Sequence, residues 1–183
     1  MRKCNAFLTA GIMVLFVVHL LWGVLMMMGV AAGGNSSFTA LSYLMAAMIV
    51  GHIGIGCKLT IDTLHAVKKA GVSYPGQNRL FWIRRISGFE LVLFMGIHVW
   101  LFTGVQEGGA FRLQHFNSPA FWSQILMVIA LAVHLLTNIR PLKIALGIED
   151  SKNYKTDILI VLSVLLLLSA IGFVIYLFRW RAV

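Results

Sequence analysis

Four histidines lie inside long apolar runs of this sequence, each in a different run: His19, His52, His98 and His134. An imidazole side chain can ligate a metal, transfer a proton or donate a hydrogen bond. Ionisable side chains are costly inside a membrane, so a histidine in such a run marks a functional site by default. The chemistry open to the four together depends on which of them reach the same depth.

The composition predicts a membrane protein. Of the 183 residues, 60% are hydrophobic, which is well above the proportion in soluble domains. The two cysteines, Cys4 and Cys57, provide neither a disulfide framework nor a Cys-x-x-Cys motif. The formal net charge of +9 comes from basic residues that cluster at the ends of the apolar runs, so we expect no nucleic-acid partner.

Five apolar runs are long enough to cross about 30 Å of hydrocarbon at a rise of about 1.5 Å per residue. They cover residues 6–30, 38–57, 81–103, 119–138 and 158–178. The first begins like a signal peptide, but its apolar run is long and lacks a small-residue cleavage site, so we expect a retained helix. No internal repeat or linker divides the chain. We predict one all-α domain over residues 1–183, an integral membrane bundle of five helices.

The distribution of charge predicts the orientation. If the N-terminus is cytoplasmic, 12 of the 15 Lys and Arg residues lie on the inner side, and only Arg112, Arg179 and Arg181 lie on the outer side. Cytoplasmic loops carry an excess of Lys and Arg. We therefore expect the N-terminus in the cytoplasm and the C-terminus outside.

The connections between the helices are unequal. The second helix is expected to continue beyond its apolar part to about residue 68 and to break at Gly71. Residues 139–156 are expected to form an inner loop. At the end of the outer loop over residues 104–118, we predict Ser118 as the N-cap of the fourth helix, with Pro119 at its first position.

Two of the histidines share the outer half of the bundle. The first and third helices run from the inner to the outer side. His19 lies sixteen residues after Lys3, and His98 lies thirteen residues after Arg85. At the helical rise, both are roughly 20–24 Å from the inner boundary.

The other two histidines share the inner half. The second and fourth helices run from the outer to the inner side. His52 precedes Lys58 by six residues, and His134 precedes Arg140 by six. Both are therefore about 9 Å from the inner boundary, which separates the two layers by roughly 10–15 Å.

Two imidazoles that face each other at one depth are what a six-coordinate haem iron requires, with one nitrogen on each side of a flat macrocycle. Small residues that would leave room for the ring lie nearby: Gly23, Gly51, Gly54, Gly56, Gly96, Ala130 and Ala132. Close packing of membrane helices also explains such residues. His65 and His115 lie outside the two layers. Zinc is not expected, because no other strong ligands converge at either layer. The sequence thus predicts two haems and four axial histidines as metal ligands.

In this constellation the sequence resembles the cytochrome b membrane anchor of the succinate dehydrogenase and quinol:fumarate reductase family, in its single-chain, five-helix, dihaem form. The stretches that carry the resemblance cover most of the chain. They are Val18, His19 and Leu20; Gly51 to Gly56 around His52; Arg85, Ile86, Ser87 and Gly88 followed by His98, Val99 and Trp100; and His134 with Leu146, Gly147 and Ile148.

The resemblance implies a subunit that passes electrons between menaquinone or menaquinol and an iron–sulfur subunit, with a flavoprotein subunit beyond it at the cytoplasmic face. It implies two haems b, the inner one held by His52 and His134 and the outer one by His19 and His98. It places the chain in a bacterial cytoplasmic (inner) membrane. The flavin and the dicarboxylate site would belong to the partner subunits.

Glu90 is the one acidic residue within a predicted span, eight residues before His98. Some members of the family have a glutamate two residues before the ligand of the fourth helix, where this chain has Ala132. We therefore expect no proton path through that position. Glu90 either serves quinone or proton chemistry, because an intramembrane carboxyl is costly, or pairs with a basic residue at the boundary.

Haem propionates are anionic and favour Arg, Lys, Ser or Trp near the membrane interfaces. The candidates are Arg85, Ser87 and Lys143 for the inner haem, and Arg112 and Trp122 for the outer one. Each of these residues also fits a plain role as a positive-inside anchor or a member of the aromatic belt, and Trp22, Trp82, Trp100 and Trp180 fit that belt.

Two other functions agree with the same hydropathy. One is a cytochrome b anchor of a hydrogenase or formate dehydrogenase, although such anchors commonly draw two haem ligands from one helix. The other is a haem-free transporter or assembly factor whose histidines relay protons. The absence of a haem absorption band in the purified protein would favour the haem-free function over both cytochrome b functions.

Overall fold

The computed structural model describes residues 1–33, 35–71, 78–102, 106–107, 110–111, 116–148 and 152–181. Five helices dominate it: α1 (Arg2–Met27), α2 (Ser36–Lys69), α4 (Arg79–Phe102), α5 (Ser118–Leu146) and α6 (Lys152–Arg181). Between α4 and α5, the two-residue strands β1 (Gln106–Glu107) and β2 (Ala110–Phe111) pair antiparallel. All five helices are long and apolar enough to cross a membrane, which indicates a multi-pass membrane protein.

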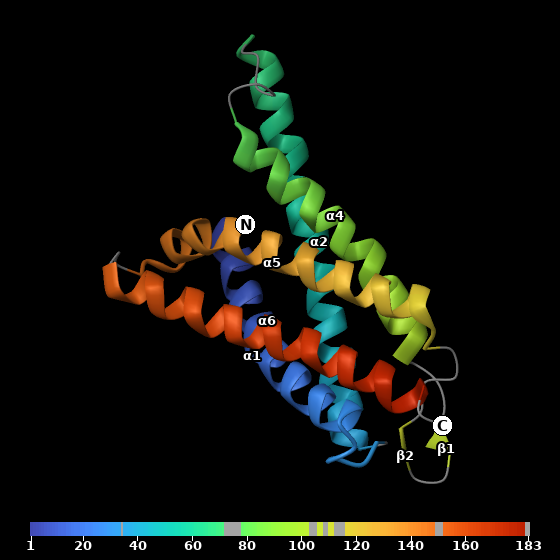
Figure 1. The fold of residues 1–183 in the computed structure, drawn as a ribbon. Coiled ribbons are helices and arrows are strands. Elements are labelled where there is room, and N and C mark those ends of the chain that lie inside the picture. Colours follow the sequence, from blue (N-terminus) through green and yellow to red (C-terminus); the bar gives the residue numbers. More distant parts are fainter. Residues whose placement is uncertain are drawn as a thin grey trace.

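Successive helices run in opposite directions, and the two ends of the chain lie at opposite ends of the bundle (Figure 1). Helix α4 packs against α5, and α6 packs against both α5 and α1. Helix α2 packs against α1 and has no comparable contact with any other helix among the described residues. The C-terminal part of α2 and the start of α4 extend past the other helices at the top of the view (Figure 1). We call the end where α1 and α4 begin the basic end.

The helix boundaries correct the sequence-based prediction in places. Helix α1 ends at Met27, short of the predicted residue 30, and Gly29 just beyond it takes a φ of 74°. Helix α2 continues to Lys69, close to the predicted residue 68. The predicted N-cap Ser118 is wrong. Asn117 caps α5, because its side chain accepts a hydrogen bond from the backbone N–H of Ala120 at 3.0 Å.

The predicted inner loop over 139–156 is also wrong at both ends, because α5 stays helical through Pro141 to Leu146 and α6 begins at Lys152. A proline inside a helix removes the hydrogen bond to the carbonyl four residues earlier, here that of Thr137. Arg84 of α4 supplies a donor instead, since its Nε donates to the Thr137 carbonyl at 2.9 Å. This bond stabilises the continued helix and joins α5 to α4.

The main core lies between α1, α5 and α6. Its buried members are Leu20, Val24, Met27, Val128, Leu166, Phe173 and Tyr176. At Gly172 of α6, a Cβ atom would come within 3.0 Å of Met27 Cε and 3.2 Å of a Val24 methyl group, so the glycine permits the close approach of α6 to α1. Helix α2, in contrast, contains no buried residue. Among the described residues, no helix packs closely against the side of α2 that faces away from α1, and we call this the unpacked side of α2.

Candidate functional site

The structure brings the four histidines together in the pairs that their depths predict. The ring centroids of His19 on α1 and His98 on α4 are 6.0 Å apart, with an interplanar angle of 67°. Those of His52 on α2 and His134 on α5 are 6.5 Å apart, with an angle of 89°. We call the first the outer pair and the second the inner pair. Each of the four helices thus contributes one imidazole.

Each imidazole is held through its Nδ1 atom by a polar side chain of another helix. The partners are Ser42 Oγ for His19 at 3.1 Å, Thr9 Oγ1 for His52 at 3.2 Å, Gln124 Oε1 for His98 at 2.8 Å and Ser87 Oγ for His134 at 3.2 Å. Such partners fix the orientation of a metal-ligating histidine and select its tautomer. The four bonds therefore engage the Nδ1 atom of every ring and leave Nε2 as the other ring nitrogen.

The direction of these hydrogen bonds follows from the hydroxyl groups. Each hydroxyl uses its one hydrogen on a backbone carbonyl of its own helix: Thr9 on Asn5 at 2.8 Å, Ser42 on Phe38 at 2.9 Å and Ser87 on Arg84 at 3.3 Å. The hydroxyl oxygens must then accept from the imidazoles, as the amide oxygen of Gln124 does. All four rings are accordingly protonated at Nδ1, which leaves a lone pair on each Nε2.

A neutral imidazole with a free Nε2 lone pair is a common metal ligand. Two metal–nitrogen bonds of about 2.0 Å, together with about 1.1 Å from each nitrogen to its ring centre, place two rings roughly 6 Å apart across one metal. Both pairs match this spacing. The described part of the chain contains no group of three or more His, Cys, Asp or Glu that could hold a metal ion, so each pair offers two ligands only.

Open space adjoins one histidine of each pair. Gly23 lies one turn after His19, and Gly56 lies one turn after His52, so each faces the same side of its helix as the histidine. A Cβ atom placed at either glycine would meet nothing within 4 Å. Together with the unpacked side of α2, this leaves room beside the imidazoles for a flat group. The residues present therefore fit a haem at each pair.

The segment from Arg84 to Gly88 of α4 contacts His134 of the inner pair. Ser87 is 2% exposed and binds the His134 ring, and Gly88 lies against the same ring, with its Cβ position 3.2 Å from His134 Cε1. The Arg85 guanidinium lies 4.9 Å from the centre of the Phe81 ring. Lys143, in the last turn of α5, is 6% exposed. Arg85, Ser87 and Lys143 were predicted to contact a haem propionate. Of these three, Ser87 forms a hydrogen bond with the His134 imidazole.

Aromatic side chains surround the outer pair. Phe38 of α2 stacks on His19 with centroids 5.3 Å apart, and Phe102 stacks on His98 at 4.5 Å. Trp22 contacts Phe38 at 6.2 Å, and its buried Nε1 has no hydrogen-bond partner among the described residues. This donor fits an anionic or carbonyl acceptor on a bound group. Trp22, which the sequence analysis assigned to the aromatic belt, thus also lies next to Phe38, which stacks on His19 of the outer pair.

The other predicted residues lie elsewhere. Trp122 is 60% exposed on α5, in contact with Phe121. Arg112 and His115 lie outside the described residues. His65 is exposed on the extension of α2, away from both pairs, as expected. Glu90 is also exposed, and within the described ranges it forms no ion pair. The ion pair found there joins Lys58 and Asp62 at 3.5 Å.

Sequence reasoning missed three residues that hold the histidines: Thr9, Ser42 and Gln124. Polar side chains occur in all five apolar runs, so Thr9 and Ser42 gave little signal. Gln124 gave a stronger signal, because an amide side chain is costly within a membrane span. It lies six residues into α5, and His98 lies four residues before the end of α4 at the same side of the bundle. A comparison of depths would have matched the two.

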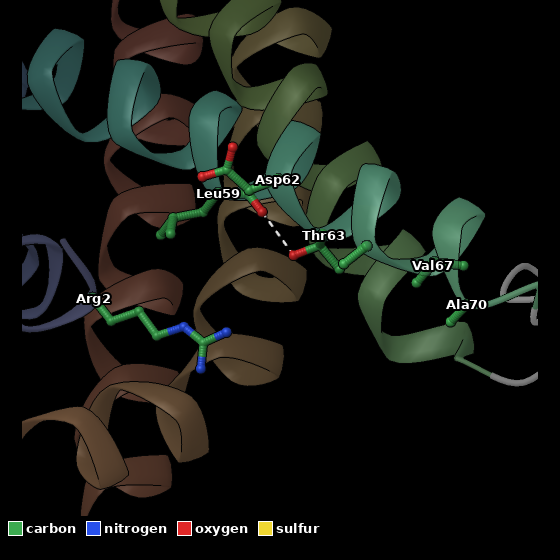
Figure 2. Close-up of a pocket in the computed structure, with 7 residues that line it drawn as sticks. Arg2, Leu59, Asp62, Thr63, Val67 and Ala70 are labelled. Carbon is green, nitrogen blue, oxygen red and sulfur yellow. Dashed lines mark hydrogen bonds between the residues drawn. The ribbon is translucent and has the colours of Figure 1, made fainter.

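A separate recess of about 560 Å³ lies at the basic end, lined by Arg2 of α1 and by Leu59, Asp62, Thr63, Ala66, Val67 and Ala70 of α2. Figure 2 shows the Arg2 side chain reaching from α1 toward this face of α2, where the Thr63 hydroxyl donates to the Leu59 carbonyl at 2.7 Å. The recess contains none of the histidines and lies apart from both pairs.

Comparisons with protein-family models, with curated proteins and with solved structures find no match to this chain. The function must therefore be argued from the two histidine pairs and their surroundings.

Proposed function

We propose that this chain is the dihaem cytochrome b membrane anchor of a quinol:fumarate reductase or succinate dehydrogenase complex. The observation that carries the proposal is the presence of two depth-separated pairs of imidazoles, each pair with two Nε2 lone pairs at the spacing of axial haem ligands. The resemblance of the sequence to that family supports the choice of partner subunits.

In this proposal His52 and His134 hold an inner haem b, and His19 and His98 hold an outer haem b. Each haem, when bound, supplies a one-electron couple. The chain itself holds the imidazoles as Nδ1–H tautomers and stacks aromatic rings beside the outer pair. It also separates the layers by roughly 10–15 Å at the helical rise. Electrons would pass between a menaquinone or menaquinol and the basic end of the bundle.

The basic end is proposed to face the cytoplasm of a bacterium, with the chain in the inner membrane. This orientation places 12 of the 15 Lys and Arg residues on the cytoplasmic side, as the positive-inside rule expects. The α2 extension ends in exposed Lys68 and Lys69, which suit a charged docking surface for the iron–sulfur subunit, with the flavoprotein subunit beyond it. The flavin and the dicarboxylate would then be bound by those partners.

The proton-relay alternative is poorly supported by the hydrogen bonds. A relay requires each imidazole to pass a proton to a group that can pass it on. Here the Nδ1 protons of His19, His52 and His134 go to hydroxyls whose own hydrogens are held by backbone carbonyls. A hydrogenase-type or formate dehydrogenase-type anchor fits less well because each of four helices supplies one ligand here.

The test is a reduced-minus-oxidised spectrum with haem quantification on the chain purified with its bound subunits. We expect two haems b per chain and co-purification of an iron–sulfur protein and a flavoprotein. Absence of haem would contradict the proposal. Two haems with the subunits of a hydrogenase or formate dehydrogenase would keep the cofactors but contradict the assigned complex.

Glu90 is proposed to exchange protons with the quinone, since it is an exposed carboxyl in a span and has no ion-pair partner among the described residues. We expect Glu90→Gln to lower the rate of quinol-linked electron transfer by about 100-fold, as for loss of a general acid–base group. Haem content and fumarate reduction from a soluble artificial donor should be unchanged. Asp62→Asn, on the α2 extension, is the control. Equal quinol rates in wild type and Glu90→Gln would exclude this role.

A further inference from the structure

The four acceptors that hold the imidazoles are not equivalent. Three are hydroxyl oxygens at 3.1 or 3.2 Å from Nδ1. The fourth is the amide oxygen of Gln124, which accepts from His98 at 2.8 Å, the shortest of these bonds. Gln124 is also 0% exposed. A buried amide is costly unless its polar atoms form hydrogen bonds, and those of Gln124 do.

The orientation of the Gln124 amide is fixed by a second contact. Its Nε2 donates to Ser123 Oγ at 3.0 Å, and that hydroxyl donates to the Ala120 carbonyl at 2.6 Å. A rotated amide would bring two N–H donors to His98 Nδ1–H and lose both contacts. The oxygen of Gln124 is therefore held toward His98.

A strong acceptor on the far nitrogen changes an imidazole as a ligand. It draws the Nδ1 proton away and raises the basicity of Nε2. A more basic ligand favours the more highly charged oxidation state of the bound metal, so second-shell hydrogen bonds adjust a haem potential. The effect is strongest in a buried site, where water does not compete for the bond.

We infer that Gln124 is a positioning residue for the outer pair: it fixes the Nδ1–H tautomer of His98 and lowers the reduction potential of the metal centre bound there. This inference rests on the proposed function, since the centre is the outer haem. Thr9, which holds His52 through a longer bond to a hydroxyl, should have the corresponding but weaker effect at the inner pair.

The test is a redox titration of the complex, followed by absorbance and by low-temperature electron paramagnetic resonance, for wild type, Gln124→Leu and Gln124→Met. Both variants should raise the midpoint potential of the outer haem and leave the inner one unchanged. A tenfold change in the ratio of the site's affinities for ferric and ferrous haem corresponds to a shift of 59 mV in the midpoint potential. Gln124→Glu retains an acceptor oxygen, so its outer potential should stay at or below that of wild type.

Thr9→Val is the matched control, because it removes one acceptor at nearly constant shape and should raise only the inner potential. Loss of the outer haem in Gln124→Leu with retention in Gln124→Glu would also support the inference. An unmoved outer potential in both apolar variants, or equal shifts of both haems, would overturn it while leaving the proposed function intact. A wild-type complex without haem would overturn both.

Discussion

The His52→Ala chain should retain one haem of two, and the His98→Ala chain should retain the other. The reason is geometric: the rings form two pairs, 6.0 and 6.5 Å between centroids, and each substitution removes one ligand of one pair. With one axial imidazole removed, we expect the haem of that pair to lose its low-spin spectrum and to be lost on purification, because the described residues offer no third ligand at either pair. The measurement is haem quantification per chain, with difference spectra that identify which component is missing.

The control is His65→Ala, on the exposed extension of α2, which should retain both haems. The double variant His52→Ala with His134→Ala should match His52→Ala alone, because both ligands serve the same haem. Loss of both haems in each single variant, at unchanged yield of folded protein, would contradict independent pairs. So would loss of the same component in His52→Ala and His98→Ala.

Gly56→Phe should remove the inner haem while the outer haem remains. Gly56 lies one turn after His52, where a Cβ atom meets nothing within 4 Å. A phenylalanine there would occupy the space beside His52 without a clash against protein, so the chain should fold and only the bound group should be displaced. Haem quantification and the position of the remaining absorption band are the measurements.

Gly54→Phe is the matched control. Gly54 also has nothing within 4 Å of its Cβ position, but it lies two residues after His52 and therefore on the other side of the helix. The Gly54→Phe variant should therefore retain both haems. Equal haem content in the two variants would show that the space at Gly56 is not used by a bound group.

The number of helices and the pairing of the histidines were predictable because both depend on distance along a helix axis. Hydropathy marks the apolar length, and a fixed rise converts residue counts into depth. His52 and His134 could be matched in this way because each precedes a basic residue by six positions. Depth thus limits which of the histidines can meet.

The partners of the histidines were not predictable because they depend on the rotation of each helix about its axis. Ser87 was expected at a propionate, yet α4 is rotated so that its hydroxyl meets His134. The end of α5 was missed for another reason. Hydropathy falls at Asn138, but Arg84 of a different helix satisfies the carbonyl that Pro141 leaves open. Such compensation between helices has no local signal in the sequence.

The unpacked side of α2 has a consequence for how the chain is assembled and maintained. Among the described residues, α2 contains no buried residue and packs closely only against α1, so it gains little free energy from the rest of the bundle. Any group that binds α2 and α5 together stabilises the folded chain in proportion to the logarithm of its concentration. If a haem is that group, as proposed, we expect the lifetime of the newly made chain against proteolysis to depend on the supply of haem, so that haem availability would limit how much of the chain accumulates.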